Sequence, residues 1–373
     1  MSTLKVTNIE HESTANGGIQ LDNAGHVTID GQQLPTAGAL SNRNLVINGA
    51  MQVAQRDTSS TSNGYQTVDR MRPEAGQVSV TQSQQTLSSG SPYDEGFRYF
   101  MRSAVTTTSS GTNTYFQIET RLEAQDIAQS GWKYEDSSTD IVCSFWARSS
   151  LAGTYYVQYR ALDSGSGLFY INKSFTLAAD TWTKVEHVIP GHSSLVFNND
   201  TGTGFQITIV PHYGTDYTDS GVAVDSWFTR SGDNYLPDFA QNWANTSSAT
   251  FDFTGLQLEV GSKATPFEHR TFADELQRCY RYYQEHIIFN NDDGFTADAY
   301  ATTSGQYHVN SLLLPVRMRA TPTTTNVLGD LTSNLQERTL LAKSDTCIEY
   351  TIRSNSTGRF YGGFVSFDAS AEL

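Results

Sequence analysis

Aromatic side chains are the residues of this chain whose type and number best suit a binding function. The sequence contains 19 Tyr and 5 Trp, and an aromatic ring face complements the apolar C–H surface of a sugar. Trp227 and Trp243 flank the loop-like stretch 229–242, so we expect both rings to be exposed and predict them as glycan-binding residues. Trp146 lies inside an alternating apolar stretch, which predicts a place in the core.

No combination of residues predicts catalysis. The sequence lacks a Gly-x-Ser-x-Gly elbow, a Gly-x-x-x-x-Gly-Lys phosphate loop and a His-Glu-x-x-His helix. With 39 Asp and Glu residues, some pair of carboxylates will lie close together in any fold, so their number does not indicate glycoside cleavage. We therefore predict that the protein is not an enzyme and uses no cofactor.

Metal binding also has little support in the sequence. Cys143, Cys279 and Cys347 are widely spaced and include no Cys-x-x-Cys pair, which indicates buried thiols rather than a zinc or redox site. The run Asn290–Gly294 offers oxygen ligands but lacks the spacing of an EF-hand calcium loop, and we interpret it as a polar turn. No metal site is predicted.

The charge and hydropathy of the chain exclude two classes of partner. Its 24 basic and 39 acidic residues give a net charge of -15, whereas phosphate binding needs clustered Lys and Arg, so we expect no nucleic-acid partner. No apolar run approaches the roughly 18 residues that span a bilayer, and the first residues form no apolar signal segment. We expect no membrane insertion, and a protein that stays in the cytoplasm where it is made until something releases it.

The elements that must position any site are β-strands. Runs rich in Val, Ile, Tyr, Phe and Thr, bounded by Gly, Ser, Asp and Asn, predict an all-β protein. Their spacing within residues 41–270 indicates a β-sandwich or jelly roll, with residues 212–221 as a loop at one end. The clearest predicted strands there are Ile141–Arg148, Thr154–Arg160, Leu168–Leu177, Thr183–Ile189 and Gly204–Val210.

Residues 1–40 form a separate, short segment with two alternating stretches, around Ile19–Leu21 and Val27–Ile29. An isolated hairpin is only marginally stable in water. The segment therefore needs a partner, either copies of itself or a docking protein, and a disordered tail is the alternative. We predict a docking and trimerisation segment here.

One helix is predicted, over residues 271–286. Phe272, Leu276, Cys279 and Tyr283 recur at spacings of four, three and four, which is typical of a packing stripe. Thr271 is placed to cap the helix. The stripe must pack on the sandwich or on copies of the helix, and we name these four residues as the packing and trimerisation residues. Strands resume after the helix and predict a smaller β domain at 287–373. Its predicted strands are Tyr300–Thr303, Gln306–Leu314, Cys347–Ile352 and Phe360–Phe367, and the prolines that bracket 315–322 make that segment an edge strand or a connection.

Several stretches of the chain resemble one family of phage proteins. Asn44–Arg56 (NLVINGAMQVAQR), followed by Val68–Met71 (VDRM), resembles the opening of tailed-phage fibre and structural proteins and departs from their pattern only at Val46. Gly255–Glu268 (GLQLEVGSKATPFE) and Glu275–Tyr283 (ELQRCYRYY) carry the most specific resemblance. Further similar stretches are Leu4–Ile9, Gly18–Ile29, Ser144–Ser149, Phe175–Lys184, Leu314–Pro322 and Asp368–Leu373, of which the first two resemble fibres of marine and cyanobacterial phages.

This resemblance implies a homotrimeric virion protein with a jelly-roll domain related to carbohydrate-binding modules. We predict a tail fibre or spike that mediates host attachment, made in the host cytoplasm and located in the virion. Its expected partners are copies of itself, other virion proteins bound through residues 1–40, and host cell-surface polysaccharide or lipopolysaccharide. The alternatives are a capsid (head) fibre or decoration protein without a receptor role, and a polysaccharide depolymerase.

Overall fold

The computed structural model describes residues 7–9, 18–21, 27–29, 32–33, 41–287, 297–328, 332–362 and 364–373. They form an all-β protein, and the chain divides into two compact units, residues 1–270 and residues 271–373. Each unit is described by itself. Among the described helices, none is long and apolar enough to cross a membrane.

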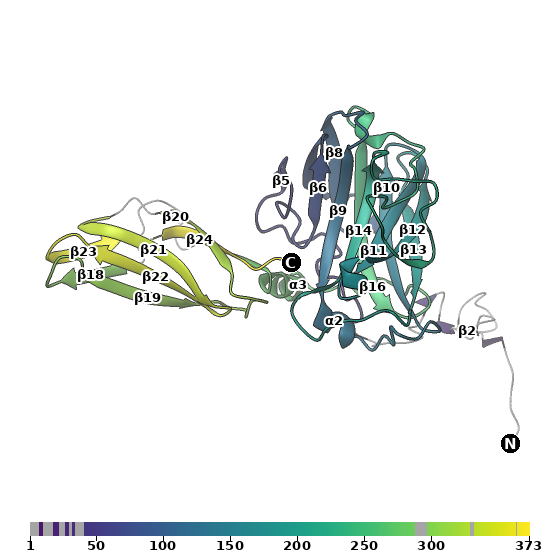
Figure 1. Ribbon diagram of the computed structural model, residues 1–373. Helices are drawn as coiled ribbons and strands as arrows, with labels where there is room; N and C mark the ends of the chain where they lie inside the picture. Colours follow the sequence, from purple (N-terminus) through teal and green to yellow (C-terminus); the bar gives the residue numbers. More distant parts are fainter. Residues whose placement is uncertain are drawn as a thin grey trace, which may run out of the picture. The chain divides into compact units, whose positions relative to one another are not determined.

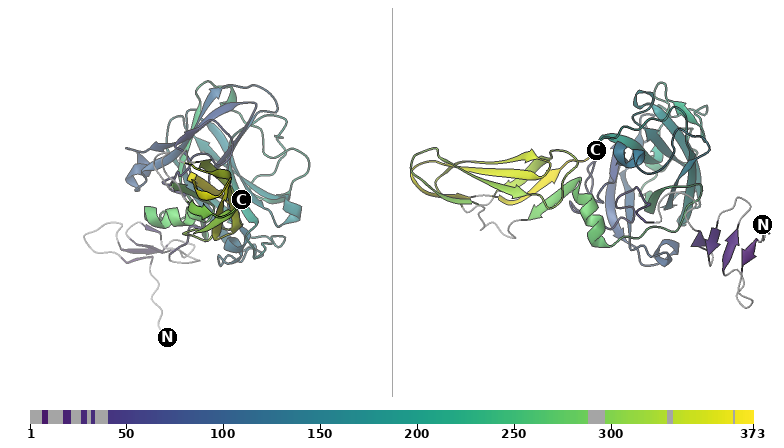
Figure 2. Two further views of the ribbon diagram at one scale, coloured as in Figure 1. Left: turned by 90° about the vertical axis from the view of Figure 1, so that its left-hand side faces the viewer. Right: turned by 90° about the horizontal axis from the view of Figure 1, so that it is seen from below.

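Two six-stranded antiparallel sheets make up the sandwich of the first unit (Figures 1 and 2). The first sheet has the order β13-β10-β16-β8-β7-β5, and the second has the order β15-β12-β11-β14-β9-β6. The strands are β5 (Ser59–Ser60), β6 (Arg72–Gly76), β7 (Ser79–Thr86), β8 (Tyr99–Thr107), β9 (Tyr115–Glu123), β10 (Asp140–Ser149), β11 (Gly153–Ala161), β12 (Phe169–Leu177), β13 (Thr183–Pro190), β14 (Thr203–Tyr213), β15 (Trp227–Thr229) and β16 (Thr250–Val260).

The core of the sandwich is aromatic and lies between the two sheets. Phe145 on β10 meets Phe175 on β12 with ring centroids 5.5 Å apart, and Tyr155 on β11 meets Phe251 on β16 at 5.4 Å. Each ring comes from a strand whose alternate residues point inward. The five strands that the sequence predicted most clearly are confirmed as β10 to β14.

Two sequence expectations for this unit need correction. β14 continues to Tyr213, so the predicted loop at 212–221 begins after that residue. Short helices also interrupt the strands: α1 (Ser91–Asp94), α2 (Ala124–Ala128) and the 3-10 turns η1 (Gly165–Gly167) and η2 (Trp243–Asn245). Helices of one turn are too short to give a periodic pattern, which is why the sequence did not reveal them.

Hydrogen bonds join the place where the chain enters the sandwich to the place where it leaves. The buried Asn44 Oδ1 accepts from the amide nitrogens of Val46 and Leu258, each at 3.0 Å. Its Nδ2 donates to the carbonyl oxygen of Leu256 at 3.2 Å, and Arg270 Nη2 donates to the Asn44 carbonyl oxygen at 2.5 Å. We call this set of contacts the clasp. The clasp therefore holds the first and last residues of the sandwich sequence together.

The N-terminal segment contains a small sheet of the order β1-β2-β3-β4. Ile19 pairs with Ile29 and Leu21 pairs with Val27, so the predicted pairing of these two stretches is confirmed. Ile19, Leu21 and Ile29 are exposed. The strands are β1 (Asn8–Ile9), β2 (Ile19–Leu21), β3 (Val27–Ile29) and β4 (Gln32–Gln33).

The second unit begins with the helix α3 (Phe272–Tyr280). Thr271 caps it as predicted, accepting from the amide of Asp274 at 3.2 Å. The helix ends at Tyr280 rather than near His286, which corrects the predicted range. The reason is tertiary: the next residues form β17 and pair antiparallel with β24, so the sheet satisfies their backbone groups.

The rest of the second unit consists of three small sheets of the orders β17-β24-β20, β18-β23 and β19-β22-β21. β20 and β21 were not predicted from the sequence, and residues 315–322 connect strands as expected. The strands are β17 (Tyr283–Ile287), β18 (Ala297–Ala301), β19 (Tyr307–Leu313), β20 (Thr323–Leu328), β21 (Leu335–Ser344), β22 (Cys347–Ser354), β23 (Gly358–Gly362) and β24 (Phe364–Ser370).

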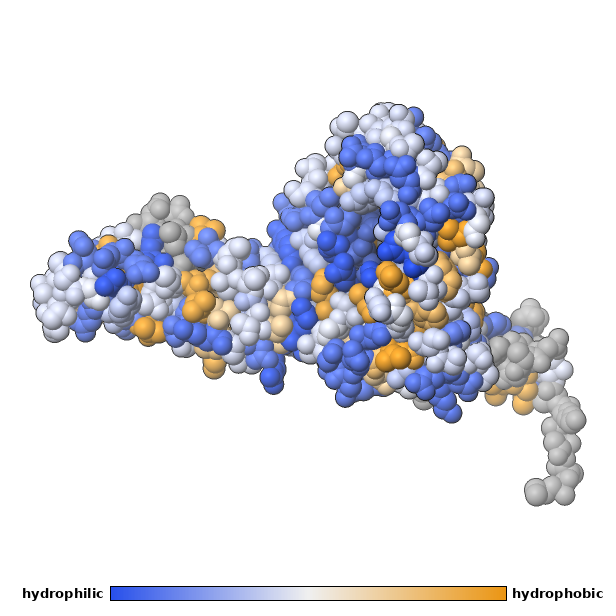
Figure 3. Space-filling model, viewed as in Figure 1, coloured by the Kyte–Doolittle hydropathy of each residue, from blue (hydrophilic) through white to orange (hydrophobic). Residues whose placement is uncertain are grey.

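The four residues of the predicted packing stripe do not form one buried face in the structure. Cys279 is buried and Leu276 is half-buried on α3, whereas Phe272 remains 54% exposed and Tyr283 lies on β17. Other apolar side chains of this unit also face solvent, and Figure 3 shows hydrophobic residues among hydrophilic ones on its visible face. The most exposed are Tyr300, Tyr307, Val309, Leu313, Val327 and Leu341.

Candidate functional site

A groove of about 360 Å³ lies on the outer face of the second sheet of the sandwich, the face turned away from the core. Five neighbouring strands, β6, β9, β14, β11 and β12, supply most of its lining, and the loops after β14 and β15 supply the rest. The volume falls at the lower end of the range for small-molecule sites. Its lining residues are Glu74, Tyr115, Gln117, Glu119, Gln158, Arg160, Tyr170, Gln206, Thr208, Tyr213, Tyr217 and Tyr235.

Strand alternation explains why these side chains share one face. On β9, Tyr115, Gln117 and Glu119 line the groove, while Phe116 and Ile118 between them belong to the core. Successive residues of a strand point to opposite faces of the sheet. The antiparallel register of the neighbouring strands then brings their outward residues beside those of β9.

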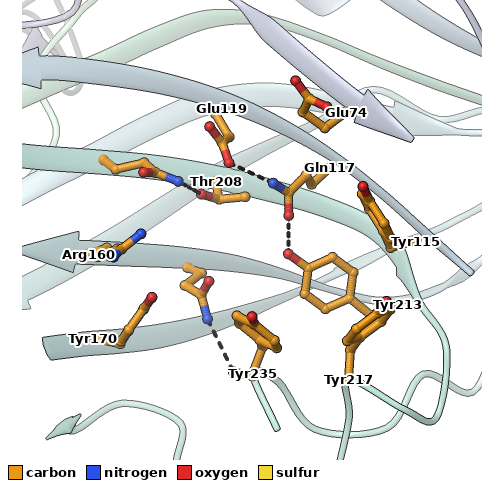
Figure 4. A pocket seen from close by; sticks show the side chains of 12 residues that line it. Glu74, Tyr115, Gln117, Glu119, Arg160, Tyr170, Thr208, Tyr213, Tyr217 and Tyr235 are labelled. Atoms are coloured by element: carbon orange, nitrogen blue, oxygen red, sulfur yellow. Dashed lines mark hydrogen bonds between the residues drawn. The ribbon is translucent and has the colours of Figure 1, made fainter. Parts of the chain in front are cut away.

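Four tyrosines form an aromatic cluster at one side of the groove (Figure 4). The ring centroids of Tyr115 and Tyr217 lie 5.8 Å apart, those of Tyr213 and Tyr235 also lie 5.8 Å apart, and Tyr217 contacts Tyr213 at 5.9 Å. These contacts are edge-to-face, the arrangement that the charge distribution of aromatic rings favours. Tyr217 and Tyr235 are half-buried, so each keeps surface for a ligand.

A chain of polar groups runs along the groove beside this cluster. The Tyr213 hydroxyl donates to Gln117 Oε1, and Gln117 Nε2 donates to Glu119 Oε1 at 2.6 Å. Glu119 Oε2 also accepts hydrogen bonds from Arg72 at 2.9 Å and from Arg121 at 2.7 Å. Three side chains, Gln117, Arg72 and Arg121, therefore donate to this one carboxylate.

Burial shifts the pKa values of groups in the groove, among them Glu74 and Tyr213. Burial raises the pKa of Glu74 above its usual range, and the nearby Arg72 opposes that rise. Burial also raises the pKa of Tyr213 well above 10, and the negative charge of Glu119 adds to the effect. The Tyr213 phenol therefore remains neutral near pH 7 and acts as a hydrogen-bonding group with an apolar ring face.

Arg160 and Tyr170 lie on the other side of the groove in Figure 4. Arg160 Nε donates to the carbonyl oxygen of Gly167 at 2.6 Å, and its guanidinium carbon lies 5.4 Å from the centroid of the Tyr170 ring. Gln206 Oε1, on the groove floor, is buried and has no hydrogen-bond partner in the part of the chain that the structure describes. The groove thus combines aromatic walls with a floor of amide, carboxylate and guanidinium groups.

The structure does not bring the two predicted glycan-binding tryptophans into this groove. Trp243 is completely buried and its ring stacks on Phe116 at 5.1 Å, so the expectation of an exposed ring is wrong for this residue. Trp227 is half-buried, one ring face covers Phe169 at 5.2 Å, and its Nε1 donates to the Pro190 carbonyl oxygen at 2.8 Å. The loop-like sequence beside each tryptophan was a poor indicator of exposure, because both rings pack against core residues.

The sequence signal that could have found the groove is the chemistry of outward strand positions. Tyr115-x-Gln117-x-Glu119 alternates with core residues, and so does Tyr156-x-Gln158-x-Arg160. Long polar and aromatic side chains at such positions are typical of a sheet face that binds something rather than one that only meets water. Which strands lie side by side is a tertiary property that this signal does not give.

A second cavity of about 320 Å³ shares Tyr213 with the groove and is lined by residues near positions 110–112, 212–218 and 238–242. His212 lines it and is mostly buried. Among the described residues, no group of three or more His, Cys, Asp or Glu side chains is arranged to hold a metal ion. The polar run 290–294 lies outside the described residues.

No protein-family model and no curated protein matches the chain. Similar solved structures include the enzymatically active domain of tailspike protein 4 of bacteriophage CBA120, with a TM-score of 0.31 and 10% identity over 58% of this chain and 21% of that one. A family 11 carbohydrate-binding module from Clostridium thermocellum, in complex with a mixed-linked tetrasaccharide, has a TM-score of 0.27 and 13% identity over 56% and 98%.

A cyclase from Fischerella sp. TAU has a TM-score of 0.34 and 8% identity over 60% of this chain and 99% of that chain. This chain spans about a fifth of the tailspike chain named above. At such low identities and TM-scores these similarities assign neither a family nor a function.

Proposed function

We propose that the protein is a non-enzymatic structural component of a phage virion, a trimeric tail fibre or spike that attaches to a host-surface glycan. The observation that carries the proposal is the groove, in which half-buried tyrosine rings stand beside a floor of amide and charged groups. A sugar unit has apolar C–H faces and a rim of hydroxyls, so it is complementary to both parts of such a surface. We further propose that the sandwich is a jelly roll of the kind found in carbohydrate-binding modules.

The virion part of the proposal rests on the motifs that resemble tailed-phage fibre proteins. Two of them, Asn44–Arg56 and Gly255–Glu268, supply all the residues of the clasp except Arg270. Both stretches therefore contribute to the clasp, which supports interpreting them as one sequence signature.

A homotrimer would supply partners for apolar side chains that a single copy leaves exposed. Phe272 on α3 and Leu313 at the end of β19 are 54% and 80% exposed, and Ile19 and Ile29 of the N-terminal sheet are each 40% exposed. Apolar surface on a soluble protein often marks a contact with another chain. Three linked grooves would also raise a weak affinity for a polymeric glycan through avidity.

The test of the groove compares the protein with its Tyr217→Ala variant in binding to intact host cells and to purified host polysaccharide. Loss of one stacking ring should weaken binding at least about tenfold, since stacking on a ring contributes on the order of 1–3 kcal/mol. Tyr300→Ala is the matched control, because it removes a tyrosine that is 71% exposed and lies in the other unit. Equal binding by Tyr217→Ala and the unaltered protein would exclude the groove.

The position in the particle is tested by removing residues 1–40, whose sheet shares no strand with the sandwich sheets. If these residues dock the protein, the shortened chain will bind cells but not fibre-less particles. If neither form binds cells while the full chain binds particles, the capsid-fibre or decoration alternative is correct. Sedimentation equilibrium of the full chain at micromolar concentration tests the trimer, and a monomeric mass would refute it.

One observation favours a second candidate, a polysaccharide depolymerase. Glu74 and Glu119 share the groove, and their environments differ, since burial raises the pKa of Glu74 while Glu119 accepts hydrogen bonds from Arg72, Arg121 and Gln117. Paired carboxylates of that kind supply the acid and the base of glycosidases. Release of reducing sugar from host polysaccharide, abolished by Glu74→Gln, would establish this activity and replace the non-enzymatic proposal.

A further inference from the structure

Two arginines beside the groove lack the carboxylate partner that most arginines of the sandwich have. Within the described residues neither Arg160 nor Arg230 forms an ion pair. Arg230 Nη1 donates to the Gly232 carbonyl oxygen at 2.7 Å, but its Nε is buried without a hydrogen-bond partner. The arginines of this unit that meet a carboxylate include Arg43, Arg56, Arg72, Arg102, Arg121, Arg148 and Arg270.

Both guanidinium groups stand over the same tyrosine ring. The guanidinium carbon of Arg160 lies 5.4 Å from the centroid of Tyr170, and that of Arg230 lies 5.8 Å from it. The two guanidinium carbons are therefore no more than about 11 Å apart, a distance comparable to the Debye length of about 10 Å at 0.1 M salt. Arg230 also lies 4.1 Å from the ring of Tyr235, a groove residue.

The acids of the groove do not neutralise this pair. Arg72 lies 2.7 Å from Glu74 and 2.9 Å from Glu119, and Arg121 lies 2.7 Å from Glu119. Two carboxylates thus face two guanidinium groups at that side of the groove. The groups that act electrostatically on the Tyr170 phenol are Arg160, Arg230 and Tyr235, with no carboxylate among them, although burial still raises its pKa.

We propose that the groove binds an anionic glycan, with the carboxylate or phosphate of an acidic sugar unit held by Arg160 and Arg230 while the neighbouring rings stack on the sugars. This inference rests on the proposed glycan-binding function and specifies its ligand class. A chain with a net charge of -15 repels polyanions in general. Two cations without a carboxylate partner can therefore attract an acidic sugar locally, although the chain as a whole repels polyanions. The planar guanidinium fork matches the geometry of a carboxylate and of a phosphate.

The experiment applies the full-length protein to a glycan array on which each acidic glycan, carrying uronic acid or sugar phosphate, is printed with a neutral counterpart. We expect retention of acidic glycans and loss of the signal at high salt, because the contact is ionic. Arg160→Gln and Arg230→Gln should each weaken binding at least about tenfold, since hydrogen bonds to charged groups contribute on the order of 1.5–3 kcal/mol. Retention of the carboxylate or of the phosphate members identifies which anion is bound.

Arg98→Gln is the matched control. Arg98 also lies over a tyrosine, 4.0 Å from the ring of Tyr93, and donates to the carbonyl oxygens of Tyr93 and Phe97, but it is not part of the groove. This variant should bind as the unaltered protein does. Arg160→Lys keeps the charge but not the fork, so it should recover only part of the affinity. Unchanged unfolding midpoints would separate these effects from misfolding.

The outcomes distinguish this inference from the function on which it rests. Neutral glycans bound by the protein, lost in Tyr217→Ala and kept in Arg160→Gln, would leave the glycan groove intact and overturn the anionic ligand. Acidic glycans bound equally by all arginine variants would place the anion elsewhere and also overturn it. No glycan bound by any form would overturn the proposed function itself.

Discussion

Arg270 Nη2 lies 2.5 Å from the carbonyl oxygen of Asn44, although the two residues are 226 positions apart in the chain. This contact joins the two ends of the sandwich sequence. Glu268 Oε2 strengthens it, since that oxygen accepts from the amide nitrogen of Asn44 at 3.0 Å and from Arg270 at 3.0 Å. The clasp therefore depends on a few polar side chains whose removal has predictable consequences.

Asn44→Ala should destabilise the sandwich unit by about 2–4 kcal/mol. The substitution leaves the buried amide groups of Val46 and Leu258 without their acceptor, and an unsatisfied buried group costs about 1–3 kcal/mol. Denaturant unfolding followed by tryptophan fluorescence measures this, because the last of the five tryptophans is Trp243 and all of them belong to the first unit.

Asn63→Ala is the matched control for the clasp. Asn63 also bonds the backbone through both atoms of its amide, to the nitrogen and the oxygen of Ala75, but it is exposed and water can replace those bonds. Its effect should stay within about 0.5 kcal/mol. Equal losses in the two variants would show that the clasp contributes no particular stability.

The stability of the sandwich unit should fall between pH 7 and pH 4 because of two buried histidines. Burial lowers the pKa of both His187 and His212 to about 4, whereas an unfolded histidine titrates near 6.5. The unfolded state therefore binds protons first as the pH falls, and each histidine should cost about 2 kcal/mol of stability by pH 5. Above pH 6.5 this loss is absent.

The check on this pH dependence is urea unfolding at pH 7.5 and at pH 5.0, again by tryptophan fluorescence. His212→Gln removes one of the two titrating groups and should reduce the difference between the two pH values by about half. His192→Gln is the comparison variant, because the His192 side chain is only half-buried. An identical pH difference in His212→Gln and the unaltered protein would contradict the assignment.

The three cysteines should differ in reactivity. Burial raises the pKa of Cys143 to about 12 and Cys279 is 1% exposed, whereas Cys347 is partly accessible. Alkylation requires an accessible thiolate, so iodoacetamide should label Cys347 first in the native protein and all three after denaturation. Peptide mapping by mass spectrometry measures the order, and early labelling of Cys143 would indicate that the core opens readily.

A smaller core residue at position 243 should destabilise the sandwich rather than abolish a ligand contact. Trp243 is completely buried against Phe116, so Trp243→Ala should cost about 3–5 kcal/mol. Trp243→Phe keeps an aromatic ring in the core and should cost less and leave glycan binding intact. Loss of glycan binding in a fully folded Trp243→Phe protein would restore the original prediction for this residue.

Elements with a local residue pattern could be predicted from the amino-acid sequence. Alternating apolar residues predicted the strands β10 to β14, and two short alternating stretches predicted the hairpin whose strands are β2 and β3. The cap at Thr271 followed from the position of one hydroxyl before a helical pattern. In each case the information lies within a few residues, because the side-chain period of a strand or a helix is set by its own backbone.

The groove, the clasp and the end of α3 could not be predicted from the sequence, because each of them depends on contacts between distant segments. The groove needs outward residues of five strands in one register, and the clasp needs Asn44 beside Leu258. The predicted helix stops at Tyr280 because β24, which begins at Phe364, pairs with the residues that follow. A local hydrophobic period does not specify which distant segments of the chain pack together. That packing results from burying all the apolar faces of a unit at the same time.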